Sequence, residues 1–437
     1  MVKLRKKNKL WFEAIKVIPG GNGLLSKRPE RFLPEYWPTY YKKCKGIKVT
    51  DLDNRSYLDF SNMAVGSCIL GYSNSEVNNF VKKNIDVGNN CTLNSPLEVQ
   101  LAKKIISLHP EFQKVKFAKT GGEAIAMAIR ISRAFTNSAS VAFSGYHGWH
   151  DWYLATNLNS NKNLNEHLLP GLSPLGVPKK LISTALPVKF NDVNDLNKIF
   201  SKKNYPKILI VEGARFNKMD KNFANKINEI KINKDIILII DEITSGWRSR
   251  NGGVYKFSKL NPDIVVYGKS IGNGYPISIL VGKGNVMDYA QDTFISSSLW
   301  TESTGFAAAI KTIDIFKSKN VSKFLYKQGM YIEKKWYEIA RKTNINIVTN
   351  NFKPLITFKF KDFKDSDLIS TYFTQEMLKE GFLATNSIYL SYAHKTNLIN
   401  QYLKSFEKVF KKISKNKNEI KKNLLSSKKT ADFKRLT

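Results

Sequence analysis

The sequence predicts an α/β protein with a large domain, whose mainly parallel sheet is flanked by helices, and a small α+β domain. Of its 437 residues 42% are hydrophobic, which is enough apolar material for a large buried core. From about residue 97, helical stretches alternate with short apolar runs. Continuous β-branched runs separated by helices are typical of strands buried on both faces of a parallel sheet. The expected strands are Val115–Ala118, Val141–Phe143, Ile208–Val211, Ile236–Ile240 and Ile264–Tyr267.

The spacing of apolar residues predicts the helices. Those of the middle and later parts of the chain are expected at 97–108, 121–135, 192–202, 222–231, 304–316 and 321–341. Near the start, an amphipathic helix over residues 8–18 ends at the turn Pro19-Gly20-Gly21. Residues 46–60 alternate between apolar and polar around a turn, which predicts a hairpin.

The last part of the chain changes character. It has two strand-like runs, at 355–360 and 387–392, and a long amphipathic helix that starts near Asn397. Both ends of the chain therefore look like parts of one smaller domain. The expected division is an N-terminal segment 1–65, a large domain 66–309 and a C-terminal small domain 310–437.

The net charge of +34, from 70 Lys and Arg against 36 Asp and Glu, allows two interpretations. One is a nucleic-acid-binding surface, and the other is a coat of solvated lysines. Of the basic residues 59 are Lys, whereas proteins that read nucleic acids rely on Arg for bidentate contacts. The composition therefore favours the lysine coat, and nucleic acid is not expected as a partner. A weak attraction between the basic chain ends and an anionic partner stays open.

Cysteine usage and hydropathy bear on the compartment. Cys44, Cys68 and Cys91 show no CxxC spacing, and an odd number cannot form a complete disulfide set. They are interpreted as reduced thiols of a cytoplasmic protein. The basic start continues into a stretch broken by Glu13 and Lys16, which argues against a secretory signal. No run of 18 apolar residues occurs, so no membrane-spanning helix is expected.

Three expected strand ends matter most, because parallel sheets bind ligands beyond the carboxyl ends of their strands. After Val115–Ala118, the sequence Thr120-Gly121-Gly122-Glu123 leads directly into a helix. Thr120 and Glu123 fit a capping box, and the glycines allow a ligand to approach the backbone closely. Free N–H groups and the positive end of the helix dipole suit a phosphate group. A capped helix after a glycine turn is also common without a ligand.

The other two strand ends carry charged side chains. Ile236–Ile240 ends at Asp241-Glu242, where a carboxylate is costly unless a ligand cation or a structural salt bridge pairs with it. Ile264–Tyr267 ends at Gly268-Lys269, before a glycine-rich turn. Partial desolvation would lower the pKa of Lys269 and make its amine nucleophilic, although a surface lysine is the simpler alternative. Together, a phosphate cradle, an acid and an amine match the phosphate, pyridine nitrogen and aldehyde of pyridoxal 5'-phosphate.

At these residues the chain resembles the class-III pyridoxal-phosphate aminotransferases, in particular the branch close to glutamate-1-semialdehyde 2,1-aminomutase. The resemblance covers nearly the whole chain and is most specific from Asp241 to Lys269. Other matching segments are Ile18-Pro19-Gly20-Gly21, Val49-Thr50-Asp51-Leu52-Asp53, Tyr57-Leu58-Asp59, Gly121-Gly122-Glu123-Ala124, Tyr146-His147-Gly148 and Ser296–Glu302. The closing Phe433-Lys434-Arg435-Leu436-Thr437 resembles a subgroup associated with cell-surface sugar biosynthesis. The resemblance implies a fold-type I pyridoxal-phosphate enzyme.

The resemblance also implies roles for individual residues. Lys269 would form a Schiff base with the cofactor and move a proton between substrate and cofactor, and Asp241 would pair with the pyridinium nitrogen. Ile243 and Tyr146 would pack on the two faces of the ring. The remaining cofactor residues would be Thr120, Gly121 and Gly122 at the phosphate, Asn217 near the ring hydroxyl, and Ser298, or Thr301 as second choice, from the neighbouring subunit of an obligate homodimer.

Three departures from the family pattern concern the substrate and the phosphate. In the aminomutase, an arginine shortly after the Pro-Gly-Gly turn holds the substrate carboxylate. Arg28 could serve here, although its spacing from the turn is shifted. The usual Ser-Gly-Thr phosphate segment is Thr120-Gly121-Gly122, which loses one hydroxyl. The usual Gly-Gly-Asn-Pro segment is Trp300-Thr301-Glu302-Ser303, and the bulky Trp300 is expected to reshape the substrate pocket.

These departures favour an aminotransferase that moves an amino group from a donor amino acid to a separate carbonyl substrate. A sugar-related compound is one candidate acceptor. The alternative is an intramolecular 2,1-aminomutase. A metal site is a further alternative, because His147, His150 and Asp151 have ligand-like spacing. There is no second such cluster, and the resemblance already accounts for His147, so no metal is expected.

Overall fold

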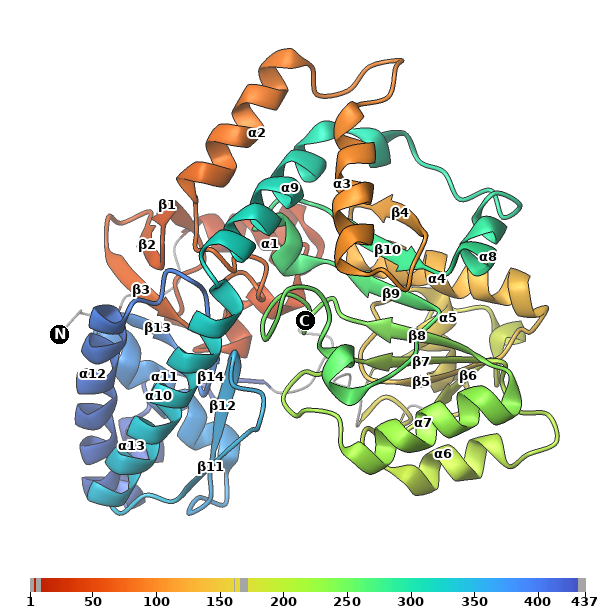
Figure 1. Cartoon of the computed structure of the whole chain (residues 1–437). Helices are drawn as coiled ribbons and strands as arrows, with labels where there is room; N and C mark the ends of the chain where they lie inside the picture. Colours follow the sequence, from red (N-terminus) through yellow and green to blue (C-terminus); the bar gives the residue numbers. More distant parts are fainter. Residues whose placement is uncertain (1–3, 5–8, 161, 166–171, 431–437) are drawn as a thin grey trace. The chain divides into compact units, whose positions relative to one another are not determined.

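The computed structural model describes residues 4, 9–160, 162–165 and 172–430 (Figure 1). The closing segment 433–437 lies outside the described residues. The chain divides into a terminal unit, Met1–Asn74 with Lys323–Thr437, and a central unit, Ser75–Ser322. The expected borders lay earlier, after residues 65 and 309. The second border falls later because helix α9 (Ser303–Ser318) packs against α2 (Ser75–Val87) and α3 (Pro96–Leu108) of the central unit.

The central unit is built on a seven-stranded sheet with the strand order β4-β10-β9-β8-β7-β5-β6 (Figure 1). The strands are β4 (Lys114–Ala118), β5 (Val141–Ser144), β6 (Ala185–Pro187), β7 (Ile208–Glu212), β8 (Ile237–Asp241), β9 (Ile264–Tyr267) and β10 (Ser278–Gly282). Strands β6, β5, β7, β8 and β9 pair in parallel, whereas β10 pairs antiparallel with both β9 and β4. The mainly parallel sheet is therefore confirmed. Because β10 lies between β9 and β4, β4 points the same way as the parallel strands, and all six end at one edge.

Burial explains why these runs are continuously apolar. Every residue of β5, β7, β8, β9 and β10 is buried, as expected for strands with both faces covered. Helix α4 (Gly121–Thr136) packs across β4, β10, β9, β8 and β7, and its buried face includes the small residues Ala124 and Ala128, which allow close approach to the sheet. The other helices of this unit include α5 (Asp151–Leu154), α6 (Val193–Phe200), α7 (Lys221–Lys234) and α8 (Gly284–Met287).

The terminal unit contains two small sheets and five helices within the described residues, if α10, which begins at the border, is included. One sheet has the order β1-β2-β3-β13 and the other β11-β12-β14. The strands are β1 (Tyr41–Lys45), β2 (Lys48–Asp51), β3 (Ser56–Phe60), β11 (Ile347–Thr349), β12 (Leu355–Phe360), β13 (Phe382–Ala384) and β14 (Ser387–Tyr389). The helices are α1 (Lys9–Val17), α10 (Val321–Lys342), α11 (Ser366–Lys379), α12 (Thr396–Lys415) and α13 (Ile420–Asn423). The expected hairpin is present as the antiparallel pair β2–β3.

Aromatic side chains fill the core of the terminal unit. Phe358 of β12 makes edge contacts with Phe373 of α11 and with Phe406 of α12, and Trp336 of α10 stacks on Phe406 at 5.7 Å between ring centroids. These rings join three helices to one sheet, so the amphipathic α12 expected from the sequence has a clear packing partner.

The described residues also show whether any helix could cross a membrane and what state the cysteines have. None of their helices combines the length and apolar composition needed to cross a bilayer. Cys44, Cys68 and Cys91 are all free thiols; Cys68 is buried and Cys91 is exposed. Burial raises the pKa of the Cys68 thiol to about 11.

Candidate active site

The carboxyl ends of the central strands bring the candidate residues to one edge of the sheet. Asp241 is the last residue of β8, and Glu212, the last of β7, pairs with it in register. Lys269 follows β9, Thr120 follows β4, and His147 follows β5. Residues far apart in the chain therefore gather where ligands of parallel sheets bind.

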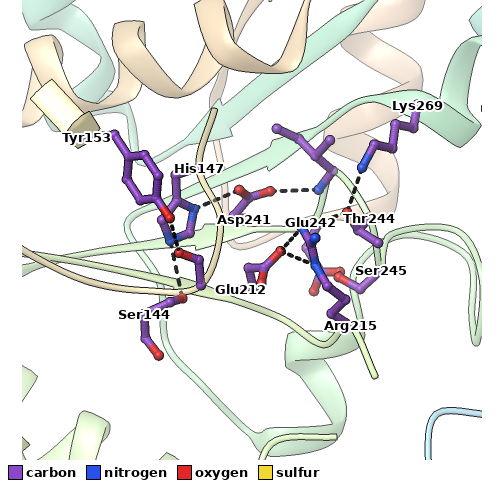
Figure 2. A network of polar contacts seen from close by, with 12 residues as sticks. Ser144, His147, Tyr153, Glu212, Arg215, Asp241, Glu242, Thr244, Ser245 and Lys269 are labelled. Carbon is purple, nitrogen blue, oxygen red and sulfur yellow. Dashed lines mark hydrogen bonds and ion pairs between the residues drawn. The ribbon is translucent and has the colours of Figure 1, made fainter. Parts of the chain in front are cut away.

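The Asp241 carboxylate is buried and held on both oxygens (Figure 2). Its Oδ1 accepts the backbone N–H of Ile243 at 2.9 Å, and its Oδ2 lies 2.8 Å from Nδ1 of His147. The other ring nitrogen of His147, Nε2, lies 3.2 Å from the carbonyl oxygen of Ser144. Both ring nitrogens of His147 thus have an oxygen atom as partner, and these contacts fix the orientation of the ring beside the carboxylate.

Lys269 is placed by an unusual backbone conformation. Its φ is +44°, in the left-handed region that residues other than glycine rarely adopt. Strain of this kind persists where the surrounding structure fixes it, and it clusters at functional sites. The amine is held as well, because Nζ donates to the hydroxyl of Thr244 at 2.8 Å (Figure 2).

The environment of Lys269 disfavours its charged form. Burial is the main cause and the positive charge of Arg215 the next, and together they lower the pKa of Lys269 to about 7, against the opposing effect of Asp241 and Glu212. A lysine with this pKa is partly neutral at neutral pH. Its amine is therefore available as a nucleophile or proton acceptor, which meets the requirement inferred from the sequence.

Arg215 links the remaining polar groups (Figure 2). Its Nε and Nη2 donate to Oε1 of Glu212 at 3.0 and 2.5 Å, and Nη2 lies 3.5 Å from the Thr244 hydroxyl. The guanidinium also lies over the ring of Tyr146, 5.4 Å from its centroid. Arg215 thus joins the acid that ends β7 to the hydroxyl that binds Lys269.

The start of α4 approaches this group through glycines. A Cβ on Gly121 would lie 2.8 Å from Cδ1 of Ile243, and one on Gly268 would lie 3.4 Å from Cγ2 of Ile243. Ile243 therefore packs between the start of α4 and the turn that carries Lys269. The N–H groups of Gly121 and Gly122 open the helix and have no acceptor within it.

The predicted capping box is confirmed, whereas the role of Thr120 at the phosphate stays a prediction. The Thr120 hydroxyl donates to Oε2 of Glu123 at 3.0 Å and accepts the Glu123 N–H at 3.4 Å, while the Thr120 N–H binds the same carboxylate oxygen at 2.8 Å. The side chain of Thr120 is thus engaged in capping α4, and the backbone of the following glycines remains for a phosphate.

A second acid at the end of β8 serves the framework. Glu242 is fully buried, accepts the hydroxyl of Ser245 at 2.5 Å and accepts the backbone N–H of Tyr255 at 2.8 Å. Burial raises the pKa of Glu242 to about 8. These bonds tie the loop after β8 to the chain before β9.

Several predicted site residues make no hydrogen bond or ion pair with this group among the described residues. Asn217 is exposed in the turn after β7, and Ser298 is exposed in a short helical turn, where the Thr301 hydroxyl donates to its carbonyl at 3.4 Å. Trp300 lies in the same turn and is partly buried. Arg28 belongs to the terminal unit, where a Cβ on Gly20 would overlap its guanidinium. The roles of these residues stay predictions.

Three residues of the site were not assigned from the sequence. Glu212 could have been found, because it ends an apolar strand in the same way as Asp241. Thr244 lies within the matched block, but nothing in the sequence indicates that its hydroxyl binds Lys269. Arg215 sits in an irregular turn, where no periodicity marks it. The described residues contain no group of three His, Cys, Asp or Glu side chains that could hold a metal ion.

The residues present fit pyridoxal 5'-phosphate. At the start of α4, Gly121 and Gly122 carry no side chain that would cover the backbone, and their N–H groups suit a phosphate. The buried Asp241 carboxylate suits a protonated pyridine nitrogen, and the Lys269 amine suits an aldehyde. Acid, amine and cradle belong to the same unit and meet around Ile243.

Comparison with known proteins agrees with this fit. The profile of the aminotransferase class-III family matches residues 34–422. The chain is 30% identical over 410 residues to 3-aminobutyryl-CoA aminotransferase of Cloacimonas acidaminovorans, covering 90% of this chain and 94% of that protein. It is 27% identical over 435 residues to glutamate-1-semialdehyde 2,1-aminomutase of a Sulfurihydrogenibium species, covering 94% and 99%.

A solved structure supports the fold. The FumI protein of Sphingopyxis sp. MTA144, determined in its pyridoxal-phosphate form, superposes with a TM-score of 0.83 at 22% identity, over 93% of this chain and 96% of that chain. At that identity the likeness concerns the fold alone, which is the fold-type I architecture expected from the sequence. Family profile, relatives, fold and site agree, and the chain therefore belongs to the class-III aminotransferases, enzymes that depend on pyridoxal 5'-phosphate.

Proposed function

We propose that this enzyme moves an amino group from a donor amino acid to a separate carbonyl compound, with Lys269 as the covalent attachment point of the cofactor. The observation that carries the proposal is the amine of Lys269, oriented by Thr244 and partly neutral near pH 7, together with the buried Asp241 at the same edge of the sheet. In the overall reaction the donor leaves as a keto acid, and the acceptor leaves as an amine.

Asp241 and Lys269 have different roles in the proposed reaction. When bound, pyridoxal 5'-phosphate supplies an electron sink for negative charge that develops on the substrate carbon. Asp241, held by His147, provides a buried negative charge for a protonated ring nitrogen. Lys269 would hold the cofactor, and its amine, partly neutral near pH 7, would take up a proton from the substrate carbon and return it.

The same edge of the sheet gives roles to the flanking residues. Ile243 and Tyr146 would pack on the two faces of the cofactor ring, and the N–H groups of Gly121 and Gly122 would bind its phosphate. Thr120 supports that cradle through its capping box. Asn217 would approach the ring hydroxyl, which requires the exposed turn after β7 to face the cofactor.

An intramolecular aminomutase is the second candidate, and it is favoured by the similarity to glutamate-1-semialdehyde 2,1-aminomutase over nearly the whole chain. The two activities differ in their use of a donor. An aminotransferase consumes a separate amine, whereas an aminomutase starts from the pyridoxamine form of its cofactor and regenerates it. Arg28 and Trp300, the departures near the substrate, favour a different substrate from that of the aminomutase.

The deciding experiment follows the absorbance of the pyridoxal form during incubation with a panel of amine donors that includes glutamate and alanine. Conversion to the pyridoxamine form, with release of the matching keto acid, supports transamination. Conversion of glutamate-1-semialdehyde by the pyridoxamine form, with no response to any donor, would establish the aminomutase instead. The Lys269→Ala variant is the matched control, in which neither conversion should occur. Once a donor is known, sugar-derived ketones should be tested first as acceptors, together with the keto compound that corresponds to 3-aminobutyryl-CoA, the compound named for the relative.

We further propose a homodimer, working in the cytoplasm, in which Ser298 or Thr301 completes the phosphate site of the neighbouring subunit. Exposed apolar side chains surround that segment: Phe294 is 89% exposed and Leu299 is 63% exposed. Leu93, which is 79% exposed, lies on the loop after α2. This loop is bonded to the same region, because the Ser303 N–H donates to the carbonyl of Asn89 at 2.9 Å. Apolar surface of this kind is typical of an interface.

Subunit mixing tests the shared site. Lys269→Ala and a Ser298→Ala/Thr301→Ala double variant would each be poorly active alone. If the partner completes each site, mixed dimers contain one intact site and recover activity. Lack of recovery, with dimers confirmed by sedimentation, would place both groups in one subunit.

A further inference from the structure

His150 lies against the start of α4, although the chemistry described so far does not use it. A Cβ on Gly122 would lie 2.8 Å from Cε1 and 3.0 Å from Nδ1 of His150. The imidazole therefore occupies the space that a side chain at position 122 would need. Gly122 has no left-handed φ, so the close packing of His150 is what makes glycine necessary there.

The ring of His150 is held in place but lacks a polar partner. Trp149 stacks on it, with ring centroids 4.5 Å apart and planes at 24°. The ring is partly buried, and its Nδ1 is buried with no hydrogen-bond partner among the described residues. A buried ring nitrogen that makes no hydrogen bond costs free energy, and a ligand group beside it would remove that cost.

The cradle itself is poor in side-chain donors. Gly121 and Gly122 have none, and the hydroxyl of Thr120 donates to Glu123. The Glu123 carboxylate also adds negative charge next to the place where a phosphate would bind. A cationic or hydrogen-bonding side chain at this point would offset both effects.

We propose that His150 is a ligand of the cofactor phosphate and takes the place of the hydroxyl that position 122 lacks. The proposal rests on the proposed use of the α4 start as the phosphate site. It assigns to the chain a phosphate-binding group outside the glycine segment. It also explains two observations together, the unpartnered Nδ1 and the glycine at 122.

Charge near His150 adds a pH dependence. Burial lowers the pKa of His150, while the nearby carboxylates of Glu123 and Asp151 act in the opposite direction. A bound phosphate brings further negative charge and favours the imidazolium, so phosphate binding takes up a proton. Affinity for the phosphorylated cofactor should therefore fall as pH rises through the His150 transition.

The test compares two ligands that differ only in the phosphate. Pyridoxal 5'-phosphate and pyridoxal are each titrated into the cofactor-free, full-length enzyme, and binding is measured by calorimetry and by absorbance. His150→Ala should lower the affinity for pyridoxal 5'-phosphate by about 10- to 100-fold, the range expected for loss of a charge-assisted hydrogen bond. The affinity for pyridoxal should stay within about 2-fold of wild type. His150→Gln should lose the part of the pH dependence that comes from His150, because an amide does not titrate in this range.

A compensating variant protects the test against simple misfolding. Gly122→Ser alone should weaken binding, since its Cβ would meet His150. In the His150→Ala background the space is free, and Gly122→Ser adds a hydroxyl at the cradle. The double variant should therefore bind pyridoxal 5'-phosphate more tightly than His150→Ala.

The outcomes separate this inference from the proposed function. If the wild-type enzyme binds neither ligand covalently at Lys269, the proposed function fails. If the wild type binds both ligands but His150→Ala weakens them equally, or weakens neither, His150 is not a phosphate ligand and the proposed function stands. A double variant that binds no better than His150→Ala would also overturn the inference.

Discussion

The Nδ1 atom of His147 lies 2.8 Å from Oδ2 of Asp241, and both side chains are buried at the end of the central sheet. Nε2 of His147 also lies 3.2 Å from the carbonyl oxygen of Ser144, so the ring is held at both nitrogens. The Asp241 side chain therefore has polar partners on both oxygens in a place where an isolated carboxylate would be costly.

This pair leads to a first prediction. Asp241→Asn should lower kcat by at least about 100-fold, because an amide does not stabilise a protonated ring nitrogen. His147→Gln should cost about 10-fold through loss of one charge-assisted hydrogen bond. Single-turnover reduction of the pyridoxal form by a donor measures both effects. Equal rates in Asp241→Asn and wild type would remove Asp241 from the mechanism.

The bond between Lys269 and Thr244 leads to a second prediction. Thr244→Val keeps the shape of the side chain but removes the acceptor for Nζ, so the rate of proton transfer should fall about 10-fold. Thr244→Ser retains the hydroxyl and is the control, with a rate close to wild type. The measurement is the substrate deuterium isotope effect on the half-reaction, which should increase in Thr244→Val if the lysine step has slowed. An unchanged rate and isotope effect in that variant would contradict this role.

Arg215 should govern the ionisation of Lys269. The pKa of Lys269 is lowered to about 7, and after burial the charge of Arg215 is the largest cause. In the cofactor-free Arg215→Gln variant, the pH midpoint of Lys269 ionisation should move upward. In Arg215→Lys the positive charge remains, so the midpoint should stay low. Competitive acetylation across a pH series, read for the Lys269 peptide by mass spectrometry, reports the midpoint directly. A midpoint that does not move in Arg215→Gln would show that burial alone lowers it.

The same shift has a consequence for stability. The unfolded chain protonates Lys269 with an ordinary pKa of about 10.4, whereas the folded chain does so only near 7. The lysine therefore destabilises the cofactor-free fold fully below about pH 7, and the penalty declines between there and about 10.4. At about pH 6.5, Lys269→Met should raise the melting temperature of the cofactor-free protein above that of wild type. The difference in melting temperature should disappear toward about pH 10, where the unfolded lysine also loses its proton. A melting temperature equal to wild type at low pH would mean that the folded protein accommodates the charged lysine at no cost.

Patterns that are local in the chain were predicted well. The continuous apolar runs of β7, β8 and β9 predicted buried strands, because both faces of these strands are covered. The capping box of Thr120 and Glu123 was predicted because it depends on residues three positions apart. Strand β10 was missed, and it is the one antiparallel strand of the central sheet.

The candidate site was predicted only where a strand end marked it. Asp241 and Lys269 were found because a charged residue directly follows an apolar run. Arg215 had no such mark, and its pairing with Glu212 depends on the path of an irregular turn. The spacing of His147, His150 and Asp151 offers a metal site as an alternative. In the structure, His147 pairs with Asp241, whereas His150 packs on Gly122.

The sequence by itself determined the fold class, the family resemblance and the two charged residues of the site, since these depend on side-chain periodicity and on short segments. Only the tertiary structure decided which side chains meet: Thr244 with Lys269, His147 with Asp241, and His150 with Gly122. The physical reason is that these contacts arise from the order of strands in the sheet and from the close approach of loops. Both are set by packing between distant segments, which no local pattern in the chain encodes.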